Sequence, residues 1–243
     1  MLLNRRYIPF SEIKGIIHVG AHEAEELELY TASGISQVLW IEANPSLQEI
    51  VRAKIGSHPY MQLGMFAAGE KAGEAILNIA NNTQSSSLLE LGTHSSSYPD
   101  IYYRSKIKVR LDTVDNWISE NYFRREQYNF INLDIQGSEL QALQGLIKQL
   151  PYVDFVYTEV NFKQVYKNCS TVEALDDFLR QYELSRRITC RTPEGWGDAL
   201  YSKKPFHLRK NLFKLEDFCA TNIRYMKNLV KKLVYTVTDR DRR

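Results

Sequence analysis

The sequence predicts an α/β fold with a mostly parallel sheet, helices on both of its faces and an antiparallel last strand. Two observations lead to this class. Apolar segments of strand length alternate with longer segments of helical period, which is the pattern of consecutive β-α-β units. The last two strand-like segments are joined by only a few residues, TPEGWG, and such a short connection allows a hairpin but no parallel crossover.

Each expected strand is a short run of apolar or β-branched residues bounded by turn signals. The expected strands are residues 15–20, 37–42, 61–67, 74–80, 106–111, 129–134, 153–160, 185–191 and 198–204. The expected helices are residues 23–32, a segment opening at 45–49, 112–122, 138–150 and a segment opening at 170–173. Ser46 with Glu49, and Ser170 with Glu173, have the spacing of capping boxes at two of these helix starts.

Charge is distributed unevenly along the chain. Residues 203–243 hold 12 Lys and Arg against 4 Asp and Glu, so the remainder holds 31 − 12 = 19 basic and 29 − 4 = 25 acidic residues. We therefore expect one domain over residues 1–204 and a basic, mainly helical tail over 205–243. The tail is interpreted either as a packed or solvated helix or as a contact with an anionic membrane surface. The acidic body argues against a nucleic-acid partner.

Composition restricts the cellular setting. No run of 18 or more apolar residues is present, and the start of the chain lacks the apolar segment that a signal peptide needs. Cys169, Cys190 and Cys219 are widely spaced and match neither a metal motif nor a disulfide framework. We therefore expect a cytoplasmic protein. Nothing in the sequence indicates its oligomeric state.

Residues with chemical potential are expected at the carboxyl ends of the parallel strands, because ligands of open α/β sheets bind outside that edge. The first expected strand ends in Gly20, Ala21 and His22, where glycine lets a ligand approach the backbone. The second ends in Glu42 and Ala43, about 20 positions later, where an acid accepts hydrogen bonds from ribose hydroxyls. These five residues are the candidate contacts of a nucleotide-type cofactor.

The residues after the glycine turn distinguish two cofactors. A dinucleotide site has the pattern G-x-G-x-x-G, whose glycines admit a pyrophosphate at a helix N-terminus. Here the run is GAHEAE, and its glutamates would repel a pyrophosphate while tolerating the sulfonium and ammonium groups of S-adenosylmethionine. S-adenosylmethionine is therefore favoured over NAD. The same acids also suit the helix dipole without any ligand.

Six motifs in order resemble the FkbM-type methyltransferases. They are HVGAHEAEE (18–26), WIEANP (40–45), QSSSLLE (84–90), LDIQGSELQALQG (133–145), YTEVN (157–161) and GWGDALY (195–201). The resemblance extends over residues 13–204. It implies a class I methyltransferase fold and transfer of a methyl group from S-adenosylmethionine to a hydroxyl, with glycan sugars or natural-product scaffolds as acceptors.

The resemblance also implies roles for individual residues. The glycine turn (20–22) would line the cofactor, Glu42 would hold its ribose, and Asp134 would lie beside its methionine part or the reacting centre. The family usually has glycine where this chain has Ala24. The tail is not part of the resemblance.

Methyl transfer to a hydroxyl needs a base, since a protonated hydroxyl is a poor nucleophile. Asp134 and Glu159 follow buried strands and face the expected cofactor edge, so they are the candidate bases, with Asp134 ranked first. His22 and His94 are less favoured alternatives. A Mg²⁺ ion held by Asp134, Glu159 and Asp198 is chemically reasonable, but no spacing requires it, and a metal is not favoured.

The acceptor, a small molecule or a glycan, is expected to contact the polar segment 81–105 and the loop of the last hairpin. Tyrosine and tryptophan suit stacking on a sugar face, and serines suit hydrogen bonds to its hydroxyls. The candidate acceptor contacts are Ser86, Ser87, His94, Tyr98, Asn161, Trp196 and Asp198. Two alternatives remain: methylation of a natural-product or lipid hydroxyl, and a cofactor-binding module without catalysis.

Overall fold

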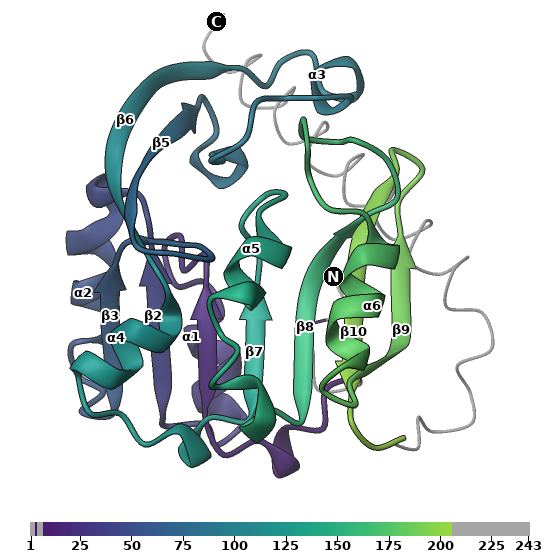
Figure 1. Ribbon diagram of the computed structural model, residues 1–243. Coiled ribbons are helices and arrows are strands. Elements are labelled where there is room, and N and C mark those ends of the chain that lie inside the picture. Colours follow the sequence, from purple (N-terminus) through teal and green to yellow (C-terminus); the bar gives the residue numbers. More distant parts are fainter. Residues whose placement is uncertain (1–2, 4–6, 206–243) are drawn as a thin grey trace, which may run out of the picture.

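A computed structural model describes residue 3 and residues 7–205, so the predicted tail lies, after Pro205, outside the described residues. A seven-stranded sheet in the order β3-β2-β1-β7-β8-β10-β9 forms the centre of the molecule, and a three-stranded sheet has the order β4-β6-β5. Figure 1 shows β5 and β6 reaching beyond one end of the main sheet, with α3 beyond them.

The main sheet confirms the predicted mixture of strand directions. Its strands are β1 (Ile16–Val19), β2 (Val38–Glu42), β3 (Met61–Met65), β7 (Phe130–Leu133), β8 (Phe155–Asn161), β9 (Ser185–Arg191) and β10 (Trp196–Ser202). β1 pairs in parallel with β2 and β7, and these pair in parallel with β3 and β8. β10 is antiparallel to both β8 and β9. The carboxyl ends of all the parallel strands therefore meet at one edge.

The second sheet was not distinguished in the sequence. It consists of β4 (Ala67–Ala68), β5 (Gly73–Ala80) and β6 (Tyr103–Asp112). One expected strand, 61–67, is divided between the two sheets at Phe66, whose ring packs on that of Trp117 with centroids 5.7 Å apart. The new sheet has a small core of its own, because one face of the β5–β6 pair is apolar.

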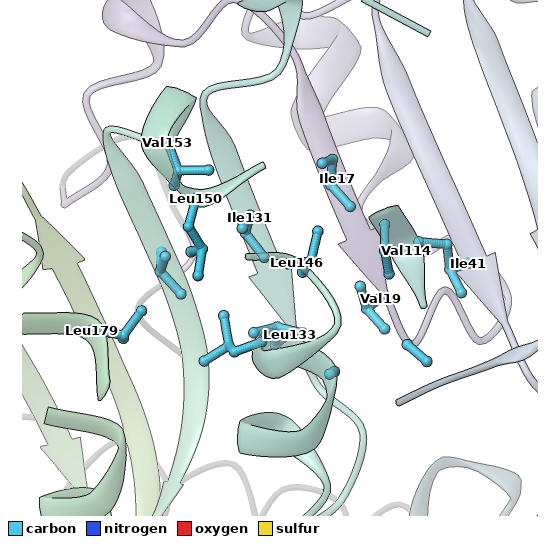
Figure 2. Packing of buried hydrophobic residues seen from close by; sticks show 14 of the residues in the cluster. Ile17, Val19, Ile41, Val114, Ile131, Leu133, Leu146, Leu150, Val153 and Leu179 are labelled. Carbon is cyan, nitrogen blue, oxygen red and sulfur yellow. The ribbon is translucent and has the colours of Figure 1, made fainter. Parts of the chain in front are cut away.

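Helices cover both faces of the main sheet. Among the described residues the α-helices are α1 (Leu27–Ala32), α2 (Gln48–Ile55), α3 (His94–Ser97), α4 (Val114–Glu120), α5 (Glu139–Gln144) and α6 (Val172–Arg180), of which α3 does not lie on the main sheet. The 3-10 turns are η1 (Phe10–Glu12), η2 (Pro45–Leu47), η3 (Thr83–Ser85), η4 (Arg125–Gln127) and η5 (Leu150–Tyr152). Residues of α4, α5 and α6 share one core with the sheet, part of which Figure 2 shows. Residues of α1 and α2 share the other core.

Alternation along β1 explains the two cores. Ile17 and Val19 face the core beneath α4 to α6, whereas Ile16 lies in the core beneath α1 and α2. Successive side chains of a strand point to opposite faces, so a strand covered on both sides needs a continuous apolar run. All four residues of β1 are accordingly buried.

Several predicted helix starts are wrong. Asn44, not Ser46, caps the second helical segment, and its side-chain oxygen accepts from the Ser46 N–H at 3.1 Å. Pro45 fills the first turn, where its missing N–H costs nothing. Thr171, not Ser170, is the N-cap of α6 and makes no side-chain capping bond. The helix expected over 23–32 begins only at Leu27, because Ala24 has a φ of +53°.

The helix expected over 138–150 is also wrong in length. Only Glu139–Gln144 is α-helical. The next residue, Gly145, packs directly on the backbone of Gly69, and a Cβ at Gly145 would lie 2.1 Å from the Gly69 carbonyl oxygen. The helix ends at this close approach, and the chain continues in turns over residues 145–149 up to η5. The helix expected over 112–122 is confirmed in a shorter form, with Thr113 as its cap.

His18 is a buried polar residue on β1. Its ring stacks on Trp40 with centroids 4.7 Å apart, and its Nδ1 lies 3.0 Å from the Tyr30 hydroxyl. Asn132 donates to that hydroxyl at 2.8 Å, which leaves the hydroxyl proton for Nδ1. Burial lowers the pKa of His18 to about 3, so the folded protein holds a neutral imidazole here.

This buried imidazole should make stability depend on pH. The unfolded chain takes up a proton near pH 6.5, whereas folded His18 takes it up only near pH 3, so stability is lost as the pH falls between these values. His18→Phe keeps the stacking on Trp40 but cannot take up the proton. Between pH 7 and pH 4.5, we expect urea unfolding of the wild type to lose roughly 2–3 kcal/mol more than the variant. Parallel losses in both proteins would contradict this expectation.

Candidate active site

Two cavities meet at the carboxyl edge of the parallel strands. The first is narrow, about 80 Å³, and lies between the glycine turn, the end of β2 and the second sheet. The other is larger, about 540 Å³, and extends over β7, β8 and β10. Five residues line both cavities: Gly20, His22, Gln84, Asp134 and Gln136. A ligand in the first cavity and a ligand in the larger one would therefore meet at these shared residues.

The glycine turn crosses closely over the end of β7. Gly20 has a φ of +90°, and a Cβ built on it would lie 2.0 Å from the Asp134 carbonyl oxygen. Only glycine fits this contact. His22 follows with a φ of +45°, an uncommon conformation for a residue with a side chain. Ala21, a predicted cofactor contact, packs its side chain into the core and lines neither cavity.

Glu42 closes the end of β2 beneath the first cavity. Its two oxygens accept from the backbone N–H groups of His22 and Asn44, each at 2.7 Å. Burial raises the pKa of Glu42, while these backbone bonds oppose the rise. Each carboxylate oxygen has a further lone pair, and Glu42 and Ala43 both line the first cavity. A pair of ribose hydroxyls fits this arrangement.

The polar segment 81–105 is an ordered part of the site. The Thr83 hydroxyl lies 2.7 Å from His22 Nε2, and Ser87 donates to the Gln136 carbonyl oxygen at 2.7 Å. Ser86 and Ser87, two of the predicted acceptor contacts, line the first cavity and not the larger one. His94 and Tyr98 line the larger cavity. One segment therefore covers both cavities.

The remaining predicted acceptor contacts are divided. Trp196 and Asp198 line the larger cavity, and both belong to β10, which begins at Trp196 and not at the expected residue 198. Asn161 lines neither cavity. It is 1% exposed, and its side-chain amide has no hydrogen-bond partner among the described residues.

Asp134 and Glu159, the two candidate bases, are joined by one side chain. Gln136 Nε2 donates to Asp134 Oδ1 at 2.6 Å and to Glu159 Oε2 at 3.2 Å. The amide oxygen of Gln136 accepts from the Tyr166 hydroxyl at 2.5 Å. Sequence reasoning missed Gln136, although its place in the LDIQG motif, directly after a strand-end acid and before a glycine, was a signal that would have identified it.

The two carboxyl groups both have raised pKa values. Asp134 is open to solvent through the cavity but enclosed by protein elsewhere, and this partial withdrawal from water, with the charge of Asp198, raises its pKa to about 6. Glu159 is 8% exposed, and burial together with the charge of Asp134 raises its pKa well above the usual range. Both carboxyl groups therefore hold a proton more readily than an exposed carboxyl does.

A metal site does not emerge from these carboxylates. Asp198 lies directly opposite Glu159 in the β8–β10 ladder, next to Asp134. Within residues 7–205, no three His, Cys, Asp or Glu side chains are placed to hold a metal ion. Across the same residues, no helix is long and apolar enough to span a membrane.

The order of the sheet and the strand-end groups define a class I methyltransferase with a Rossmann-like fold. The chain belongs to the family described by the methyltransferase FkbM domain, whose model matches residues 18–184. Membership of this methyltransferase family implies the use of S-adenosylmethionine.

Two relatives agree with this assignment. The chain is 25% identical over 156 residues to the 2-O-methyltransferase NoeI of Sinorhizobium fredii, and the match covers 61% of this chain and 63% of that protein. The chain thus spans less than two thirds of the length of this relative. The crystal structure of methyltransferase FkbM from Methylobacillus flagellatus KT is 16% identical, with a TM-score of 0.52 over 77% of this chain and 43% of that one. This likeness shows the fold.

The close contact at Gly20 should be sensitive to a single methyl group. Gly34 has a similar φ of +84°, but no atom lies within 4 Å of the place that a Cβ would take there, so it is a matched control. We expect Gly34→Ala to cost about 1–2 kcal/mol of the free energy of unfolding through its backbone conformation alone. Gly20→Ala should cost about 1–3 kcal/mol more through overpacking, and it should lose S-adenosylmethionine binding in calorimetry. Equal costs in urea unfolding would show that the contact is not tight.

Proposed function

We propose that this chain is an S-adenosylmethionine-dependent O-methyltransferase that methylates a sugar hydroxyl in a glycan or glycoconjugate. The observation that carries this proposal is the junction of two cavities at Asp134, with Glu42 on one side and an aromatic-lined space on the other. The similarity to a protein named 2-O-methyltransferase supports oxygen as the atom methylated.

The first cavity suits the cofactor. Glu42 would hold the ribose hydroxyls, and Ala67, Leu77 and Leu88 offer an apolar wall for the adenine ring. When bound, the cofactor supplies a methyl group on a sulfonium that leaves as a neutral thioether. The Gly20 backbone and Asp134 stand at the junction, where the methyl group would have to face the acceptor.

Asp134 would act as the base. The proton that the acceptor hydroxyl gives up on methylation would pass to a carboxylate oxygen of Asp134. Its pKa of about 6 keeps it ionised at neutral pH and still basic enough to take a proton. Glu159 would contact the acceptor beside Asp134, and Gln136 would hold both carboxyl groups in place.

The walls of the larger cavity suit a sugar. His94 packs against Tyr98 and Tyr166, with ring centroids 4.9 and 5.4 Å away, and Trp196 donates to the Tyr98 hydroxyl at 3.4 Å. Aromatic faces of this kind pack against the apolar C–H face of a sugar ring. Hydroxyls of the ring would then meet Asp134 and Glu159.

The cofactor assignment is tested by calorimetric titration with S-adenosylmethionine and, separately, with NAD⁺. We expect binding of S-adenosylmethionine alone, because Glu42 and the acids after the glycine turn suit a cationic cofactor. Binding of NAD⁺ or of neither compound would remove the basis for the roles of Asp134 and Glu159.

Asp134→Asn should abolish most turnover without unfolding the protein. Loss of a general base slows a reaction about 10²–10⁴-fold, so we expect a fall in kcat of that size in a methyl-transfer assay on sugars, with S-adenosylmethionine binding retained. In the wild type, kcat/KM should fall as the pH drops below about 6, because Asp134 becomes protonated. Asp177→Asn, on the exposed face of α6, is the control. Full activity of the Asp134 variant would exclude this residue as the base.

A further inference from the structure

The larger cavity is unbalanced in charge. Its lining includes five carboxyl groups, those of Glu25, Glu26, Asp134, Glu159 and Asp198, and no lysine or arginine among the described residues. Glu159 on β8 lies opposite Asp198 on the neighbouring strand β10. Gln136 Nε2 donates a hydrogen bond to Glu159 and another to Asp134. These three groups form a row across β7, β8 and β10.

An independent observation points to the kind of ligand that this row requires. Asn132 lies two residues before Asp134 in the chain, is 2% exposed and lines the same cavity. Its Nδ2 donates to the Tyr30 hydroxyl, but its Oδ1 has no partner among the described residues. A buried acceptor without a donor costs about 1–3 kcal/mol, so a bound group that donates here would be favoured.

Three donors beside this row are already engaged. Gln136 Nε2 donates to Asp134 and Glu159, and the Tyr166 hydroxyl donates to Gln136. The Thr192 hydroxyl donates to the Trp196 carbonyl oxygen at 3.0 Å. These three donors are therefore not available to a ligand, and the carboxyl groups of the row offer acceptor oxygens and negative charge.

A protonated primary amine matches this wall. An ammonium group has three hydrogen-bond donors and no acceptor, and its positive charge attracts the negative charge of neighbouring carboxylates. The Trp196 ring, two residues from Asp198 on the same strand, adds an aromatic surface that attracts cations. A carboxylate or phosphate would meet only like charge here.

We propose that the larger cavity selects an acceptor with a protonated amine close to the hydroxyl that is methylated, such as an amino sugar or an aminocyclitol, and rejects anionic acceptors. The amine would lie between Glu159 and Asp198, within reach of the hydroxyl at Asp134. This inference rests on the proposed function and narrows its substrate class.

The experiment is calorimetric titration of the full chain saturated with S-adenosylhomocysteine, so that the ammonium group of the cofactor is already bound. The probes are the methyl glycosides of glucosamine, N-acetylglucosamine, glucose and glucuronic acid, which share one ring. We expect the amine to bind about tenfold more tightly than the acetylated and hydroxyl forms, the effect of one charge-assisted hydrogen bond, and the glucuronide to show no binding. Equal affinities, tighter binding of the glucuronide, or no binding of the amine would overturn the proposal.

A pair of variants locates the effect. Asp198→Asn should remove the preference for the amine, while Asp177→Asn, an exposed carboxylate on α6, should keep it. Retention of the preference in the Asp198 variant would place the amine elsewhere and overturn the proposal. The titration needs no methyl transfer, so its failure is distinct from failure of the proposed function, which would show as loss of S-adenosylmethionine binding or of methyl transfer.

Discussion

Parallel pairing of β1 with β2 on one side and with β7 on the other brings Gly20, Glu42 and Asp134 to one edge of the sheet. These residues are distant in sequence and meet only because the three strands run in one direction. Burial on both faces keeps them in register, since a slip of one residue would move each side chain of β1 to the opposite core. The glycine turn, both cavities and the junction between them depend on this pairing.

Repulsion between the carboxyl groups at this edge of the sheet destabilises the folded state, and the structure limits this cost in two ways. Burial and the charge of Asp134 raise the pKa of Glu159, which favours its neutral form. Gln136 adopts a φ of +57° and donates to both neighbouring carboxyl groups. A left-handed conformation at a residue with a side chain costs of order 1–3 kcal/mol. The protein therefore gives up some local backbone stability to place this amide between the two carboxyl groups.

The segment between β5 and β6 connects the two halves of the site. Ser87 donates a hydrogen bond to the Gln136 carbonyl oxygen beside the first cavity, and His94 packs on Tyr166 beside the larger cavity. Because one segment contributes to both cavities, a change in its packing alters the cofactor wall and the acceptor wall together. The acceptor preference and cofactor binding are therefore expected to be linked through this segment.

The sequence by itself determined the alternation of strands and helices, the closing hairpin, and the strand-end residues Gly20, Glu42, Asp134 and Glu159. Strand and helix periodicity are local properties, so they are readable without the fold. Only the tertiary structure decided that Gln136 joins the two carboxyl groups and that Ser86 and Ser87 face the first cavity. It also decided where helices end, as at Gly145, which packs against Gly69. These outcomes depend on contacts between segments far apart in the chain, which pairing and packing create and no local pattern encodes.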